Sequence, residues 1–169
     1  NESEELIYRP KETYDGATPS GNSVAAYVLQ RISHITANPK YKEYADKQLR
    51  FLAGQAKDYP GGYCFTGLSF LNALYPSKEI ICLVSNKDDN TTTTKTVKRN
   101  PLDNPEFDAL KEYMSTNYNP NMIVLVKTEE NQEDLYKIAD YVKDYHLIND
   151  KTTYYICENH RCQAPVNQL

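Results

Sequence analysis

Two stretches of this chain hold residues whose types and spacing could do chemistry. The first spans residues 14–26 and reads YDGATPSGNSVAA. In this stretch a tight Asp-Gly turn, a proline and several capping residues precede an apolar helix, so small polar groups are held at a helix N-terminus. The unpaired N–H groups and the dipole at such an end favour an anionic or hydroxyl-bearing ligand. The same residue types also make an ordinary helix cap.

The second stretch, residues 157–165, reads CENHRCQAP and directly follows a predicted strand. Cys157 and Cys162 flank a four-residue loop that contains His160, and Arg161 could lower the pKa of a neighbouring thiol. Three interpretations stay open. The two cysteines form a reversible disulfide if their Cα atoms come within about 7 Å. With His160 they supply three ligands to a zinc ion. Alternatively, both are structural thiols that terminate the sheet.

Several classes of function find no support in the composition and motifs. A net charge of -4 gives no electrostatic footprint for nucleic acid. The chain contains neither GxGxxG nor GxxxxGK[ST], and neither a nucleophile elbow nor HExxH. No apolar run approaches the roughly 20 residues that span a bilayer. We therefore expect no nucleic-acid or membrane partner, and we assign no cofactor and no metal ligand.

Three helices must position the first stretch. Periodic apolar residues predict them at about residues 23–37, 41–57 and 63–74, with proline or glycine breaks between them. Short connections predict helical hairpins. The first helix is expected to bury the stripe that begins with Val24 and Val28, and the third is apolar on most sides. Cys64 and Cys82 are expected to be small buried hydrophobes.

An α/β segment must position the cysteine pair. Continuous apolar runs predict buried strands at residues 79–85, 122–126 and 152–157, with helices at about 105–116 and 131–145 and a polar loop at 86–104. This order predicts a three-stranded parallel βαβαβ sheet, with function at the carboxyl ends of its strands. The fold class is therefore mixed α and α/β, with a helical segment at 1–76 and a small α/β domain at 77–169 that ends in the CxxxxC tail.

Residues 15–26, the strand at 79–84 and the closing stretch 155–165 together resemble the carboxy-terminal end of one family. It is the YyaL family of thioredoxin-domain-containing proteins, which includes the spermatogenesis-associated protein 20 group. The resemblance runs in order from about Tyr14 to the last residue. It implies a thioredoxin-like domain upstream, followed by an (α/α)6 barrel similar to N-acylglucosamine 2-epimerases and six-hairpin glycosidases.

By this resemblance, residues 1–76 are the last part of that barrel. The chain has no CxxC and begins with Asn1, and three helices cannot close a barrel that needs twelve. We therefore expect a fragment of a longer cytoplasmic protein, inactive alone, whose partners are the upstream thioredoxin-like and barrel regions. Its apolar helix faces could also pair with a second copy.

The resemblance implies two chemical roles. The barrel part binds or processes a sugar-like ligand, with Asp15 as a general acid or base or as an anchor for a sugar hydroxyl, and with Ser20 and Asn22 lining the pocket. Alternatively, Cys157 and Cys162 form a redox pair that exchanges with the thioredoxin-like domain. A third reading makes the α/β part a non-catalytic docking domain.

Overall fold

The computed structural model describes residues 10–85, 107–158 and 161–169. The polar loop predicted at 86–104 and His160 lie outside these residues. The chain divides into two compact units, and each is described here by itself. The first contains residues up to Ser33 and from Asn38 to Leu74, whereas the second contains His34 to Ala37 and the chain from Tyr75 onward.

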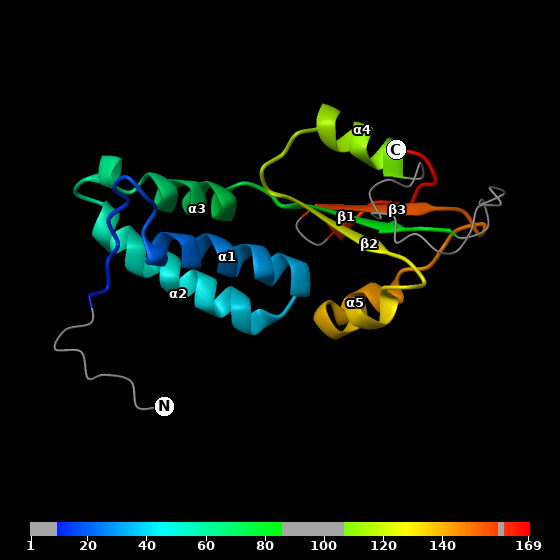
Figure 1. The fold of residues 1–169 in the computed structure, drawn as a ribbon, viewed down its shortest axis with the longest axis horizontal. Helices are drawn as coiled ribbons and strands as arrows, with labels where there is room; N and C mark the ends of the chain where they lie inside the picture. The colour runs from blue at the N-terminus through cyan, green and yellow to red at the C-terminus, as the bar shows by residue number, and fades with distance from the viewer. Residues whose placement is uncertain (1–9, 86–106, 159–160) are drawn as a thin grey trace, which may run out of the picture. The chain divides into compact units, whose positions relative to one another are not determined.

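Helices make up the first unit (Figure 1): α1 (Gly21–Thr36), α2 (Pro39–Ala56) and α3 (Cys64–Leu74), with the short 3-10 helix η1 (Pro60–Gly62) before α3. They lie where the apolar periodicity predicts them. The side chain of Asn38 accepts a hydrogen bond from the Lys40 amide (3.0 Å) and caps α2, whose first residue is Pro39. In the described residues, no helix has the length and apolar character that a bilayer crossing requires.

The predicted buried stripe of α1 is wrong, and α3, predicted to be apolar on most sides, buries its polar residues. The buried residues are small or polar: Ser23, Ala26 and Gln30 on α1, and Thr66, Ser69 and Asn72 on α3. The exposed residues are apolar: Val24 and Val28 on α1, and Leu68, Leu71 and Leu74 on α3. Hydrogen bonds explain the inversion, because Gln30 Nε2 donates to the Ser69 carbonyl (3.1 Å) and Ser69 Oγ to the Ser23 carbonyl (3.3 Å). Small side chains allow the two backbones to approach closely enough for these bonds.

By contrast, α2 buries small and apolar residues at helical spacing, since Ala45, Leu52 and Ala56 are all nearly inaccessible to solvent. The turn after α2 brings Gly62 against Tyr14, and the Asp15 amide donates to the Gly62 carbonyl (2.8 Å). A Cβ atom at Gly62 would lie 2.6 Å from a ring carbon of Tyr14. This close approach explains why a glycine stands at position 62.

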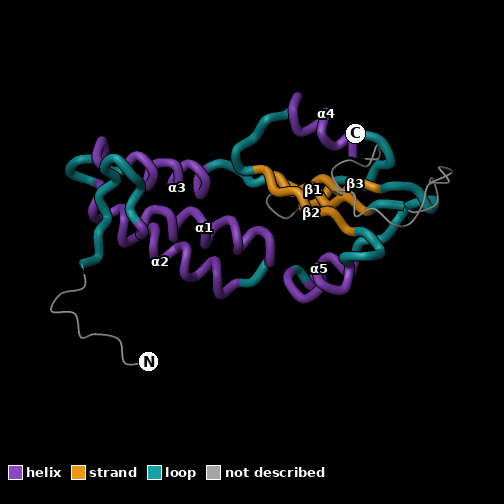
Figure 2. Tube along the Cα trace, viewed as in Figure 1, coloured by secondary structure: helices purple, strands orange, loops and turns teal. Residues whose placement is uncertain are grey.

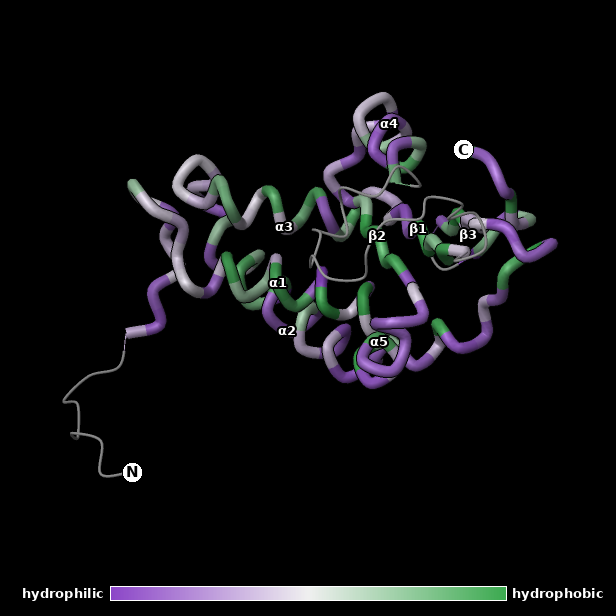
Figure 3. The backbone as a smooth tube through the Cα atoms, turned by 45° about the vertical axis from the view of Figure 1, so that its right-hand side comes forward, coloured by the Kyte–Doolittle hydropathy of each residue, from purple (hydrophilic) through white to green (hydrophobic). Residues whose placement is uncertain are grey.

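The second unit is built on a four-stranded mixed sheet. Its strands are β1 (Lys78–Leu83), β2 (Met122–Lys127), β3 (Thr153–Glu158) and β4 (Arg161–Cys162), in the order β2-β1-β3-β4. The helices α4 (Asp108–Thr116) and α5 (Gln132–Ile138) lie on opposite sides of the sheet (Figure 2), and the 3-10 helix η5 (Asp140–Asp144) follows α5. Hydrophobic residues run along β1 and β2, whereas α5 is largely hydrophilic (Figure 3).

As expected for a strand covered on both faces, β1 contributes to two core clusters. Ile80 and Cys82 pack with Phe107 and Leu110, at and beside the start of α4. Ile81 and Leu83 pack on the other face, against Ala139 and Val142 and the partly buried tyrosines of η5 and β3. The sheet therefore separates an α4 layer from an α5–η5 layer.

The predicted parallel pairing of the third strand is wrong. β1 and β2 are parallel, but β3 runs antiparallel to β1. The predicted long helix ends at Ile138, and a two-residue turn later reverses the chain. Asn149 and Asp150 have φ angles of 55° and 58°, Ile148 and Lys151 form an antiparallel bridge, and the Lys151 amide donates to the Ile148 carbonyl (3.1 Å). Two central residues with positive φ are the feature of tight hairpin turns, which Asn and Asp tolerate well.

The direction of β3 moves the cysteine pair to the other end of the sheet. Glu158 at the end of β3 lies opposite Lys78 at the start of β1, and Cys157 lies opposite Glu79. The predicted gathering of Cys157 and Cys162 with the carboxyl ends of the first two strands is therefore also wrong. They lie beside the N-terminal end of β1 instead.

Candidate functional site

Asp15 joins the N-termini of two helices. Its Oδ1 atom accepts hydrogen bonds from the Ser20 amide (2.9 Å), just before α1, and from the Ser23 hydroxyl. Its Oδ2 atom accepts from the Thr66 amide at the start of α3 (2.9 Å). A carboxylate that accepts from the first amides of two helices satisfies their orphan donors and complements their dipoles. Both of its oxygens are thus engaged within the protein.

The electrostatics agree with this geometry. Burial raises the pKa of Asp15, but the hydrogen bonds from the Ser23 hydroxyl and from the amides of Ser20, Thr66 and Phe65 outweigh it, so the pKa lies below its ordinary value. A general acid at neutral pH needs a raised pKa. Asp15 is therefore an ionised, hydrogen-bonded carboxylate whose arrangement suits a cap.

Ser20 and Asn22, the two predicted pocket residues, also bond within the unit. The Ser20 hydroxyl contacts the Thr13 carbonyl (3.1 Å) and the Ser23 hydroxyl. The Asn22 side chain donates to the Glu12 carbonyl (2.6 Å) and accepts from the side chain of Gln48 on α2 (2.9 Å). The structure thus brings Asp15, Ser20 and Asn22 together around the start of α1, where they tie the lead-in to α1, α2 and α3.

A shallow depression of about 300 Å³ adjoins this network. Its lining combines an aromatic ring, an aliphatic side chain, a thiol and one edge of the carboxyl-bearing loop: Asp15, Gly16, Pro19, Cys64, Phe65 and Leu68. The prediction that Cys64 is buried is wrong, because it is the exposed first residue of α3, whereas Cys82 is buried as predicted. This depression is where a small ligand could reach the first stretch.

Cys157 and Cys162 form a disulfide. They are opposite one another in the antiparallel β3–β4 pair, with Cα atoms 3.8 Å apart. Cys157 is 2% exposed, whereas Cys162 is exposed to solvent. The Tyr145 hydroxyl lies 3.3 Å from Cys162 Sγ. The structure thus contains a disulfide, which is one of the three interpretations that the sequence leaves open. Two sulfurs bonded to each other cannot serve as thiolate ligands of zinc.

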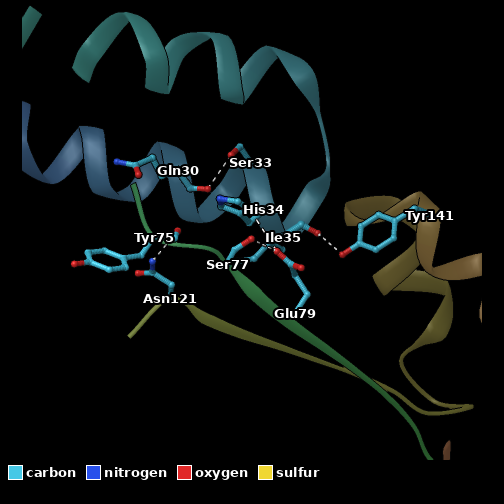
Figure 4. Close-up of polar contacts among 9 residues, drawn as sticks. All are labelled: Gln30, Ser33, His34, Ile35, Tyr75, Ser77, Glu79, Asn121 and Tyr141. Atoms are coloured by element: carbon cyan, nitrogen blue, oxygen red, sulfur yellow. Dashed lines mark hydrogen bonds and ion pairs between the residues drawn. The ribbon is translucent and has the colours of Figure 1, made fainter. Parts of the chain in front are cut away.

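Sequence reasoning missed a buried polar cluster at the start of β1 (Figure 4). Glu79 is 4% exposed, accepts a hydrogen bond from the Ser77 hydroxyl and lies 3.5 Å from His34 Nδ1. Tyr141 donates to the Ile35 carbonyl (3.3 Å), and burial, together with Tyr145 and Glu79, raises its pKa to about 12. Two sequence signals could have indicated this cluster: a glutamate (Glu79) within an apolar strand, and a histidine (His34) in the last turn of a helix.

Metal chemistry finds no preassembled site in the described ranges, where no three His, Cys, Asp or Glu side chains gather in a way that could hold an ion. His160, the third ligand of the zinc interpretation, lies outside them.

We compared the chain with protein-family models, with curated proteins and with solved structures, and none of the three comparisons finds a match. The candidate sites therefore depend on their own geometry: a capped helix junction beside a depression, and a disulfide with one exposed half.

Proposed function

We propose that this chain is a thiol–disulfide exchange module at the carboxy-terminal end of a larger protein of the YyaL type. The observation that carries the proposal is the Cys157–Cys162 disulfide, whose halves differ in exposure. An incoming thiolate can reach the sulfur of Cys162, whereas that of Cys157 is covered. Exchange requires access to a sulfur as well as a bond to break.

The resemblance described above supplies a partner, because that family begins with a thioredoxin-like domain. We also propose a cytoplasmic location, as the resemblance implies. Glutathione and thioredoxin keep most thiols reduced in the cytosol, so a disulfide that forms there is usually catalytic or redox-sensing. This combination favours a reversible bond over a structural one.

The reduction potential of the bond tests this function. Structural disulfides resist the glutathione pool and have potentials below about −300 mV. We expect the Cys157–Cys162 bond to be in equilibrium with mixtures of reduced and oxidised glutathione, at a midpoint more oxidising than about −300 mV. The measurement is stepwise alkylation of each mixture followed by peptide mapping.

The measurement uses a Cys64→Ser chain, since Cys64 is a free, exposed thiol that oxidised glutathione would also modify. A bond that stays oxidised in every mixture of reduced and oxidised glutathione overturns the exchange function. The disulfide is then structural.

We also propose that the helical unit is the end of an (α/α)6 barrel in the larger protein. Its helices bury small and polar residues against one another and expose Val24, Val28, Leu71 and Leu74. Exposed apolar positions on two neighbouring helices are typical of a surface that packs against further structure. In the larger protein, the preceding barrel helices would cover them.

Binding of a sugar-like ligand is the second candidate function, and the depression beside Asp15 favours it. Phe65 offers an aromatic ring, and Leu68 closes one side. We expect a panel of neutral sugars to raise the melting temperature of the chain, with at least one member protecting it. Leu68→Glu should abolish that shift.

Leu71→Glu is the matched control, because Leu71 is an exposed leucine of the same helix outside the depression's lining. If both variants respond as the unmodified chain does, the depression is not the site. If no sugar shifts the melting temperature, the second candidate is withdrawn.

A further inference from the structure

We propose that Cys162 is the sulfur that exchanges with the partner, and that the hydroxyl of Tyr145 stabilises its thiolate. The inference rests on the exchange function proposed above and adds a division of roles between the cysteines and a positioning residue. The electron balance of the exchange then requires a partner that supplies two thiols.

The contact between Tyr145 and Cys162 has a defined direction. A disulfide sulfur carries no hydrogen, so the Tyr145 hydroxyl is the donor across the 3.3 Å to Cys162 Sγ. Burial, together with Asp144, Tyr155 and Glu79, raises the pKa of Tyr145, so the hydroxyl keeps its proton at neutral pH. Once the bond is reduced, the same O–H points at a sulfur that can become negative, and a hydrogen bond to the charged form favours that form.

Packing holds the Tyr145 ring in this position. It meets the ring of Tyr155 on β3 edge-on, with centroids 4.6 Å apart, and that of Tyr141 at 6.3 Å. Tyr155 in turn donates to the His146 carbonyl (2.8 Å). Packing in the core cluster on the α5 side of the sheet therefore restricts the Tyr145 side chain and fixes the position of its hydroxyl.

The surroundings of Cys157 disfavour a thiolate there. Cys157 is 2% exposed, and burial penalises the charged form of a thiol. Its neighbour across the β1–β3 pair is Glu79, whose carboxyl lies on the same face of the sheet. A carboxylate at that position would oppose a second negative charge on sulfur. Cys157 is suited to be the resolving cysteine and Cys162 the exposed nucleophile.

The exchange balances as two displacements. A thiolate of the partner attacks Cys162, because it is the exposed cysteine of the pair, and forms a mixed disulfide; the expelled Cys157 sulfur takes up a proton from solvent and ends as a neutral thiol. The second thiolate of the partner then attacks the partner's own sulfur and releases Cys162 as a thiolate beside the Tyr145 hydroxyl. The partner dithiol loses two electrons and becomes a disulfide, and the Cys157–Cys162 pair gains them. A more stable leaving thiolate speeds the second displacement.

Other charged or titratable groups lie next to Tyr145 or the cysteines along the chain or across the sheet, and must be held constant in any test. They come from β1, from η5 and its C-terminal flank, and from β3 and β4: Glu79, Asp144, His146, Glu158 and Arg161. Glu158 and Arg161 lie opposite one another in the β3–β4 pair. Replacing Tyr145 by phenylalanine retains all of them and removes one hydroxyl, so the comparison isolates the hydrogen bond.

The experiment measures the pH dependence of alkylation of Cys162 by iodoacetamide in a Cys64→Ser, Cys157→Ser chain, with peptide mapping. We expect a midpoint below the ordinary thiol value of about 8.5. Tyr145→Phe should raise it by about 0.5 to 1 pKa unit, since hydrogen bonds to charged groups are the stronger ones. Tyr136→Phe is the matched control, because its hydroxyl bonds to Gln132 Oε1 on α5 (3.4 Å), and it should leave the midpoint within about 0.2 unit.

A companion chain, Cys64→Ser with Cys162→Ser, leaves Cys157 as the comparable thiol. At pH 7 it should be alkylated at least about tenfold more slowly than Cys162. Equal rates, or a midpoint that Tyr145→Phe does not move, overturn the inference while the glutathione midpoint still decides the exchange function. Conversely, a bond that glutathione does not reduce overturns the exchange function whatever the Tyr145 result.

Discussion

Replacing Asp15 by alanine is expected to lower the free energy of unfolding by about 3 kcal/mol, because it removes the acceptor for donors from two helix N-termini. The Ser20 amide, the Thr66 amide and the Ser23 hydroxyl would lose their common partner. Buried donors left without an acceptor cost about 1 to 3 kcal/mol each, and partial access of water reduces their sum. The measurement is denaturant unfolding followed by circular dichroism at pH 7.

The pH dependence of this effect has a fixed sign. The pKa of Asp15 is lowered in the folded chain, so its contribution to stability is complete above the ordinary carboxyl pKa of about 3.9 and is lost as the pH falls through the lowered value. The difference between the unmodified chain and Asp15→Asn should therefore be constant near pH 7 and shrink below about pH 4. The amide of the Asn variant turns one acceptor into a donor.

Asp46→Ala is the matched control for Asp15→Ala. Asp46 lies on α2 in a solvent-exposed pair with Lys42 (3.7 Å), and its loss should change stability by less than about 0.5 kcal/mol. An Asp15→Ala chain that keeps its melting temperature contradicts the cap. If that chain also loses a sugar-dependent shift, Asp15 is a ligand residue instead.

The sequence predicts the positions of the helices better than their buried faces. Periodicity places α1 and α3 because apolar residues recur at helical spacing. However, it assigns Val24 to the buried face of α1, where Ser23 lies, and it does not predict that α3 buries Ser69. Hydropathy counts a serine as a surface residue. It does not register that a small side chain allows close helix packing or that a buried hydroxyl finds a carbonyl, here Ser69 to Ser23.

The direction of β3 is predicted wrongly because a short local signal opposes the order of the elements. The order of elements predicts a parallel strand, while the local signal for reversal is only two residues, Asn149 and Asp150, between the predicted helix and strand. A two-residue turn with both φ angles positive overrides the general tendency of strand–helix–strand units. Asn and Asp both tolerate a positive φ angle, so this dipeptide is the sequence signal for the turn.

The sequence allows the disulfide to be predicted, but not the side chains that surround it. The spacing of Cys157 and Cys162 allowed a disulfide as one of three interpretations, and both cysteines are near one another in the chain. Tyr145 and Glu79, which give the pair its asymmetric surroundings, are distant in sequence and come together through the sheet and η5. Nothing in their local patterns distinguishes them from other tyrosines and glutamates.

The two faces of β1 provide the second large effect. Ile80 and Ile81 are 0% and 1% exposed, and alanine at either position should lower the free energy of unfolding by about 2 to 5 kcal/mol, through lost burial and a cavity. Denaturant unfolding of the two variants measures this. Similar losses are expected because both side chains are fully buried in the central part of the same sheet.

Their effects on the disulfide should differ. Ile81 packs in the cluster that contains Tyr141, Tyr145 and Tyr155, whereas Ile80 belongs to the cluster beneath α4. Valine at each position costs about 0.5 to 1.5 kcal/mol and leaves the chain folded. In the Cys64→Ser, Cys157→Ser chain, Ile81→Val should shift the alkylation midpoint of Cys162 toward the Tyr145→Phe value, and Ile80→Val should not. Equal shifts would mean that general loosening of the sheet, rather than the placement of the Tyr145 hydroxyl, sets the reactivity of Cys162.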